Sequence, residues 1–180
     1  VSKRGTPKVG VVYDPVGRDL FHAIEGEGAF KNNQPLSITS EPVMPTSKTT
    51  LTVMADQSFK DDPSYPQLQS LLQSAATELG CDGVSEVYGN GAVKNACGLL
   101  NSAPACYFKR PKEAEGGGSL WDFSATSCII KEADGWVSDF SGQPLDLNRV
   151  DSTFMNHRGL LYASSAEVAW CIMCLDRKVV

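Results

Sequence analysis

Two features that the sequence lacks limit where this 180-residue chain can act. It contains no apolar stretch of membrane-spanning length, and its start shows no basic segment followed by an apolar one of the secretory type. It also contains no long run of lysine or arginine, and its formal net charge is −5. These absences argue against a membrane protein and against a binder of polymeric nucleic acid. We therefore expect a soluble intracellular protein, cytoplasmic or organellar, with neither a membrane nor a nucleic acid as partner.

Histidine and paired cysteines, which carry much metal and nucleophilic chemistry, are scarce. The two histidines, His22 and His157, are far apart in the sequence, and no nucleophile accompanies them. The six cysteines show no paired metal-ligand spacing, and we interpret them mostly as buried, reduced thiols. Cys171 and Cys174 form one Cys-x-x-Cys pair without a second pair, so they indicate a redox or metal site only weakly.

What the sequence does contain is the apolar content and periodicity of an α/β domain. Hydrophobic residues make up 42% of the chain, which is enough to bury a core at this length. Alternating segments near the start predict antiparallel strands, and from Thr50 onward strands alternate with helices. The predicted strands are Lys8–Tyr13, Leu20–Glu25, Pro35–Thr39, Leu51–Ala55, Ser85–Tyr88, Ala105–Lys109, Trp136–Asp139 and Gly159–Ser164. The predicted helices are Tyr65–Leu79, Ala92–Asn101, Trp121–Ala133 and Ala166–Leu175.

One segment, residues 116–122, combines three consecutive glycines with the start of an apolar helix. Glycines let the backbone approach a ligand closely, and a helix N-terminus favours anions. Asp122 lies in the first turn of this helix. It is therefore either a metal ligand displayed at the turn or the acidic member of a capping box with Ser119. The spacing alone leaves both readings open.

Sequences on both sides of this segment carry a family resemblance. Residues 121–125, Trp-Asp-Phe-Ser-Ala, are followed by Lys-Glu-Ala-Asp-Gly at 131–135. Upstream, Val-Gly-Val-Val-Tyr-Asp-Pro at 9–15 and Gly-Glu-Gly-Ala-Phe-Lys-Asn at 26–32 form a hairpin sequence. Together these stretches resemble the inositol monophosphatase superfamily, and the resemblance extends to about Ser164. Within the superfamily, residues 116–121 and 142–149 are most similar to the 3′(2′),5′-bisphosphate nucleotidase-like branch.

The resemblance implies a layered α/β (α+β) fold of the sugar-phosphatase type. The chain resembles the C-terminal portion of such a protein, with a partial first sheet followed by a small mixed α/β layer. Residues 1–49 would be the remnant of the first, antiparallel-sheet subdomain. Residues 50–180 would be the C-terminal α/β subdomain.

The resemblance also implies a metal site that this chain supplies only in part. Members of the family hydrolyse phosphate monoesters with Mg²⁺ held by carboxylates. The family places its other ligands in an N-terminal Gly-Glu-Glu type segment and an Asp-Pro-x-Asp-Gly-Thr segment. Neither segment is found here, and Asp14-Pro15 lacks the second Asp, Gly and Thr. The implied metal ligand is therefore Asp122 alone, with no complete catalytic set and with weak or absent Mg²⁺ binding by this chain alone.

Four further residues have counterparts beside the substrate in the family. Glu115, seven positions before Asp122, matches a glutamate that contacts a substrate hydroxyl, although a solvated loop carboxylate is an equally good interpretation. Gly91 and Ala92 match a segment next to the substrate. Lys94 is placed like a nucleotidase lysine that would pair with phosphate, although an exposed helix lysine is the simpler interpretation.

Two polar stretches have local explanations as well as functional ones. Lys109, Arg110 and Lys112 form a basic cluster ahead of the glycines, which suits either a phosphate-facing loop or a solvated one. The loop of residues 141–158 is rich in Asp, Asn and Ser. We expect its side chains to satisfy backbone groups rather than bind ligands.

Two functions follow from the resemblance. The first is magnesium-dependent hydrolysis of a phosphate monoester, of the inositol monophosphate or 3′-phosphonucleotide type, by this chain as part of a longer or complemented enzyme. The second is a catalytically incomplete family member that acts as a structural or regulatory subunit. The expected partners are a small phosphorylated substrate and either a missing N-terminal half or another protein that covers an exposed sheet.

Overall fold

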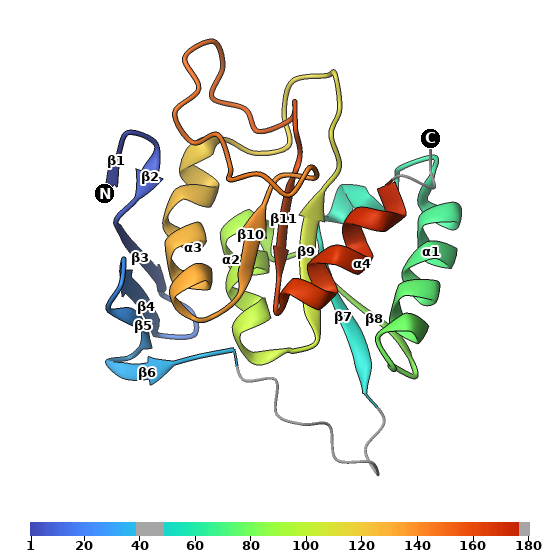
Figure 1. Cartoon of the computed structure of the whole chain (residues 1–180), viewed down its shortest axis with the longest axis horizontal. Coiled ribbons are helices and arrows are strands. Elements are labelled where there is room, and N and C mark those ends of the chain that lie inside the picture. Colours follow the sequence, from blue (N-terminus) through green and yellow to red (C-terminus); the bar gives the residue numbers. More distant parts are fainter. Residues whose placement is uncertain (39–48, 177–180) are drawn as a thin grey trace.

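The computed structural model describes residues 1–38 and 49–176 as a stack of sheets and helices (Figure 1). A four-stranded antiparallel sheet lies at one end and is followed by a layer of two helices, α2 (Gly91–Gly98) and α3 (Leu120–Glu132). A five-stranded sheet comes next, and α1 (Tyr65–Glu78) and α4 (Ala166–Asp176) cover its far face. The layered α/β fold class predicted from the sequence is confirmed.

The antiparallel sheet forms from the first alternating segments, in the order β3-β4-β5-β6. Its strands are β3 (Val9–Asp14), β4 (Asp19–Ile24), β5 (Gly28–Lys31) and β6 (Gln34–Leu36), and a short hairpin, β1 (Ser2–Lys3) and β2 (Thr6–Pro7), precedes them. The first two predicted strands are confirmed. The sequence interpretation missed β5, and it extended the next strand to Thr39, which lies outside the described residues. Asn32 and Asn33 both have positive φ (51° and 64°), so they form the tight turn that pairs β5 with β6.

One face of this sheet packs closely on α3. Gly10 is the point of closest approach, since a Cβ atom placed there would lie 2.4 Å from the carbonyl oxygen of Ala125. The carboxylate of Glu132 at the end of α3 accepts hydrogen bonds from the backbone N–H groups of Gly26 and Gly28, at 3.0 and 2.9 Å. Backbone contact at one end of the helix and ionic hydrogen bonds at the other fix the sheet to it.

The opposite face of the antiparallel sheet carries apolar side chains that reach solvent. The exposed fractions are 58% for Val11, 59% for Tyr13 and 43% for Ile24. These three residues are called the open face below. Apolar residues in adjacent strands on one uncovered face form a surface suited to further protein contact.

The five-stranded sheet is mixed and has the order β10-β11-β9-β7-β8. Its strands are β7 (Thr50–Ala55), β8 (Gly83–Tyr88), β9 (Ala105–Lys109), β10 (Trp136–Ser138) and β11 (Leu160–Ala163). Strand β7 is parallel to both β8 and β9, whereas β11 is antiparallel to β9 and β10. Parallel strands require crossover connections, and α1 and α2 provide them. Two apolar cores result, one on each face of the sheet.

The predicted strands and helices of this second region agree with the structure to within a few residues. The largest difference lies in the second helix, which ends at Gly98 and continues as a 3₁₀ turn, η2 (Leu99–Asn101). A second 3₁₀ turn, η1 (Gln57–Phe59), follows β7. Among the described residues, no helix is both long and apolar enough to cross a bilayer.

The cysteines agree with most of the sequence interpretation. All six are free thiols, and Cys97, Cys106 and Cys128 are buried. Burial raises the pKa of the Cys97 thiol to about 12, which makes it unreactive at neutral pH. Cys171 is half-buried and Cys174 is exposed, so the expectation of burial does not hold for Cys174.

Candidate functional site

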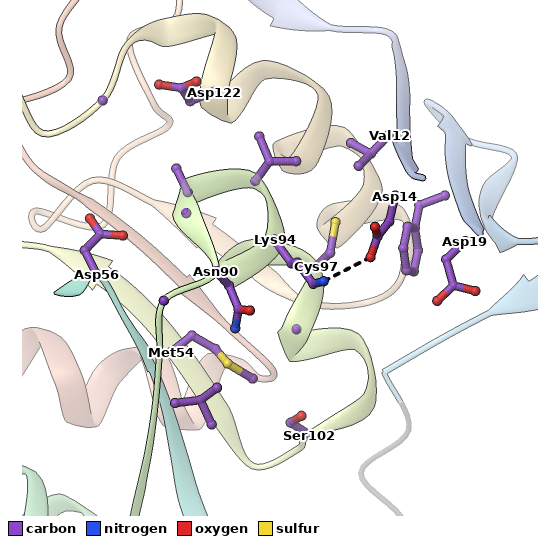
Figure 2. Close-up of a pocket in the computed structure, with 18 of the residues that line it drawn as sticks. Val12, Asp14, Asp19, Met54, Asp56, Asn90, Lys94, Cys97, Ser102 and Asp122 are labelled. Atoms are coloured by element: carbon purple, nitrogen blue, oxygen red, sulfur yellow. Dashed lines mark ion pairs between the residues drawn. The ribbon is translucent and has the colours of Figure 1, made fainter. Parts of the chain in front are cut away.

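The candidate site is a pocket of about 1050 Å³ between the antiparallel sheet and the ends of α2, α3 and β7. Figure 2 shows Asp122 and Asp56 on one side of the pocket, and Asp14 and Asp19 on the other. The charged side chains of its wall are Asp14, Asp19, Asp56, Asp122, Lys31, Lys94 and Lys109. Residues from five separate parts of the sequence therefore bring seven charges to one cavity.

Asp122 stands at the N-terminus of α3, as the sequence predicts. Its Oδ2 atom accepts a hydrogen bond from the backbone N–H of Ser119 at 2.8 Å, which is the acidic half of a capping box. Gly118 allows the approach, because a Cβ there would lie 3.2 Å from Oδ2 and 2.8 Å from the ring of Phe123. The carboxylate also lines the pocket. Asp122 is thus a helix cap with one oxygen, and Oδ1 is the oxygen that remains for a ligand.

A bridge to the polar loop holds the start of α3. The N–H of Leu120 donates to the carbonyl of Thr153 at 2.8 Å, and the N–H of Met155 donates to the carbonyl of Gly118 at 3.0 Å. Together with an isolated bridge between Ser119 and Phe154, these bonds form a short antiparallel pairing. The polar loop therefore fixes the backbone that presents Asp122.

Arg149 organises the polar loop from inside. Its guanidinium binds both carboxylate oxygens of Asp151, at 2.8 and 2.7 Å, and donates to the carbonyl of Phe154 at 3.0 Å. It also donates to Nδ1 of His157 at 2.8 Å, since a guanidinium has no acceptor. This pairing lowers the pKa of Asp151 to about 2. Burial, helped by the charges of Arg149 and Arg158, lowers the pKa of His157, so the imidazole stays neutral and accepts the bond.

Lys94, Gly91 and Ala92 line the pocket from the first turns of α2, as the family resemblance implies. The ammonium of Lys94 lies 3.1 Å from the carboxylate of Asp14, which stands at the end of β3 (Figure 2). The backbone N–H of Gly17, together with Lys94, lowers the pKa of Asp14. The lysine side chain is 55% exposed, so this ion pair is solvated and breaks at little cost.

Glu115 does not join this group. Of the described residues, those that form the pocket wall do not include Glu115, whose side chain is exposed. Its charge acts instead on Arg149 in the polar loop, where it helps to raise the pKa of the guanidinium after the larger effect of Asp151. The structure thus brings four of the five predicted site residues together and leaves Glu115 outside.

Asp56 is a site residue that the sequence interpretation missed. It follows β7 directly, and Lys109, its ion-pair partner, ends the neighbouring strand β9. Its Oδ1 atom also accepts hydrogen bonds from Asn95 at 3.0 Å and from the hydroxyl of Tyr107 at 3.4 Å. Side chains that follow adjacent parallel strands meet at the same edge of a sheet, and this rule was the signal that could have found Asp56.

The pocket carboxylates do not form a complete metal cluster by themselves. Over residues 1–38 and 49–176, the structure shows no group of three or more His, Cys, Asp or Glu side chains able to hold a metal ion. Asp14, Asp19 and Asp56 are each paired with a lysine. The described residues alone therefore do not fit a multi-carboxylate magnesium centre.

Comparison with known proteins gives a consistent picture. Residues 1–173 match the model of the inositol monophosphatase family. The chain is 31% identical over 147 residues to inositol monophosphatase 3 of Solanum lycopersicum, a match covering 78% of this chain and 48% of that protein. It also resembles the crystal structure of inositol monophosphatase II from Staphylococcus aureus MSSA476, with a TM-score of 0.66, 19% identity, and coverage of 94% of this chain and 54% of that one.

A second solved structure, that of SaIMPase-II with 2′AMP bound, has a TM-score of 0.64 and 20% identity. The match covers 94% of this chain and 56% of that one. The chain spans about half the length of the curated relatives that it matches.

Proposed function

The chain belongs to the inositol monophosphatase family, and from this premise we propose that it takes part in magnesium-dependent hydrolysis of small phosphate monoesters. The observation that carries the proposal is the placement of Asp122 at the N-terminus of α3, on the wall of a large pocket that also holds three lysines. A helix N-terminus and lysine ammonium groups both attract phosphate, and a carboxylate there attracts the cation that accompanies it.

The lysines of the pocket support a phosphate ligand because their present partners are replaceable. Lys31 and Lys94 pair with aspartates that also face the cavity. A phosphate dianion entering the pocket competes with those carboxylates for the ammonium groups. Lys94, whose side chain is the more exposed of the two, has the least packing to lose when it changes partner.

The metal centre needs ligands beyond those described here. We propose that Asp122 supplies one oxygen to Mg²⁺ and that carboxylates from further polypeptide supply the others. That polypeptide is either an N-terminal part of the same protein or a separate partner. The open face of Val11, Tyr13 and Ile24 is the surface on which we place it, because covering these side chains removes apolar area from water.

For the substrate we propose an inositol monophosphate or a 3′-phosphonucleotide. The similarity of residues 116–121 and 142–149 to the bisphosphate nucleotidase-like branch favours the nucleotide. The polar wall of the pocket suits a hydroxylated sugar or inositol ring as well as its phosphate.

The test combines activity with metal binding. The chain is mixed or co-expressed with the N-terminal half of a family member, and Mg²⁺-dependent phosphate release is measured with inositol 1-phosphate and with adenosine 3′,5′-bisphosphate. We expect release that Asp122→Asn abolishes. Asp134→Asn is the matched control, because Asp134 lies just beyond the other end of α3 and its carboxylate binds only Ser37 among the described residues. Absence of release from both substrates, or equal activity in the two variants, would contradict the proposal.

A second function, that of a structural or regulatory subunit, rests on the open face and on the incomplete metal ligand set. It predicts a stable complex with a partner but no Mg²⁺-dependent phosphate release from that complex. The same mixing experiment separates the two functions. Complex formation without activity, unchanged by Asp122→Asn, would favour the subunit.

A further inference from the structure

A second pocket of about 360 Å³ opens beside the main one. The two pockets share Asp56, Ser58 and Lys109 in their walls. We call the smaller one the side pocket. Because they share these residues, a ligand held in the main pocket can extend directly into the side pocket.

The two pockets differ in the sign of their charge. The main pocket sets four aspartates against three lysines, whereas the side pocket sets three cations, Lys109, Arg110 and Lys112, against two carboxylates. Both of those carboxylates already have partners. Asp56 pairs with Lys109, and Asp62 accepts hydrogen bonds from the hydroxyl and the N–H of Ser64, at 2.6 and 2.8 Å. The side pocket therefore has an excess of positive charge.

Lys112 supplies much of this excess. Its ammonium forms no ion pair with any residue that the structure describes. Its side chain folds over the glycine turn, since a Cβ at Gly116 would lie 3.5 Å from its Nζ. A Cβ at Gly117 would lie 3.8 Å from Cε of Lys112 and 4.0 Å from Cδ of Lys109. The two lysines thus flank Gly117, and its missing side chain leaves room between them.

Hydrogen bonds hold the backbone of this pocket in place. The N–H of Lys112 donates to the carbonyl of Asn156 at 2.9 Å, and the side-chain amide of Asn156 donates back to the carbonyl of Lys112 at 3.1 Å. Arg110 donates to the hydroxyl of Ser64 at 3.1 Å. A cationic site whose backbone is already ordered binds an anion without a large ordering cost.

We propose that the side pocket is a second anion subsite, which takes the second phosphate of a bisphosphorylated small molecule whose first phosphate lies in the main pocket. The inference rests on the proposed function, because it requires a phosphate monoester in the main pocket. It adds a location and residues for the second phosphate. Lys112 and Lys109 bind that phosphate across Gly117, with the Arg110 guanidinium on the same wall. The pair of pockets then selects bisphosphates over monophosphates.

Equilibrium binding to the full chain tests the proposal without Mg²⁺ and without turnover. Calorimetry compares adenosine 3′,5′-bisphosphate with adenosine 3′- and 5′-monophosphate, and inositol 1,4-bisphosphate with inositol 1-phosphate. We expect at least one bisphosphate to bind about tenfold or more tightly than its monophosphates, which corresponds to about 1.4 kcal/mol. The pair that shows the preference identifies whether a nucleoside or an inositol carries the phosphates.

Variants of Lys112 assign the preference to the side pocket. Lys112→Gln should weaken bisphosphate binding roughly fivefold to tenfold and leave monophosphate binding unchanged, whereas Lys112→Arg should restore most of the loss. Lys131→Gln is the matched control, since Lys131 is an exposed lysine in the last turn of α3. The proposal is overturned if neither bisphosphate binds measurably, if neither binds more tightly than its monophosphates, or if Lys112→Gln weakens both classes equally.

The outcome is separable from that of the proposed function. A Lys112-dependent preference for bisphosphate, together with no phosphate release by the complemented protein, would support the subsite and contradict the hydrolysis. Phosphate release that depends on Asp122 but shows no preference for bisphosphates would support the hydrolysis and contradict the subsite.

Discussion

The five-stranded sheet has helices on both faces, whereas the antiparallel sheet has a helix on one face and the open face on the other. Strands β9 and β11 are accordingly buried at nearly every position, and their sequences are almost continuously apolar. In β3 and β4 buried positions alternate with more exposed ones. The first sheet is stabilised from two sides, and the second depends on its contact with α3. The difference teaches where each part of this chain gains its stability.

The largest expected effect is in the five-stranded sheet. Leu161 in β11 is fully buried, and Leu161→Ala should lower the free energy of unfolding by about 2–5 kcal/mol through lost burial and a cavity. Urea denaturation measures the change. Val11→Ala on the open face is the control and should cost less than about 0.5 kcal/mol. Similar losses for the two variants would contradict the comparison between the sheets.

A substitution at the contact with α3 should release the antiparallel sheet alone. Gly10→Val places a side chain against the carbonyl of Ala125 and Cβ of Cys128, and such overpacking costs about 1–3 kcal/mol. Hydrogen exchange should show lost protection in β3 to β6 while β9 and β11 stay protected. Gly83→Ala is the control, because a Cβ in that strand meets only the side chain of Gln73, at ordinary van der Waals distance. Equal loss of protection in both sheets would mean that they unfold as one unit.

Glu132 makes a smaller contribution to the same contact. Glu132→Gln removes the negative charge that accepts the N–H groups of Gly26 and Gly28, and it should cost about 1 kcal/mol. Thermal unfolding and the exchange rates of those two amides measure it. Glu27→Gln, an exposed glutamate in the same turn, is the control. An unchanged exchange rate at Gly26 and Gly28 would remove Glu132 from the account of how the sheet is held.

Mild acid should act at the other end of α3 with the smallest effect. Because the pKa of His157 is lowered in the folded protein, the unfolded chain binds a proton first as the pH falls. The stability that this histidine contributes is fully present above its unfolded pKa of about 6.5 and declines below that value. The urea midpoint should therefore fall more between pH 7.5 and 5.5 in the natural chain than in His157→Asn. Equal pH dependence in the two proteins would show that Arg149 does not require a neutral His157.

Local sequence patterns predicted most of the fold, because strand alternation and helical periodicity are local. The missed strand β5 is only four residues long, and its turn uses Asn32-Asn33 rather than the more familiar Asn-Gly. The role of Asp122 was predictable as two alternatives because a capping box and a displayed ligand use the same spacing. The structure shows the cap and leaves one oxygen facing the pocket.

The contacts of the candidate site were less predictable, because they join distant segments. Lys94 was expected to face a phosphate, but its partner in the structure is Asp14, eighty positions earlier in the sequence. Asp56 acquires its place only because β7 and β9 are neighbours in the sheet. Glu115 lies at the predicted distance in sequence, yet the loop carries it away from the pocket. Sequence spacing cannot report either a strand order or the direction of a loop.

Trp121 gives the molecule an optical reporter of its open face. Its indole is 63% exposed and lines a shallow hollow together with Val1, Val9 and Val11. The other two tryptophans, Trp136 and Trp170, lie 6.3 Å apart on the far side of the five-stranded sheet. Whatever covers the open face therefore shifts the emission of one tryptophan to shorter wavelength and leaves the other two as an internal reference. Fluorescence of the unlabelled protein is enough to follow the assembly of its missing surface.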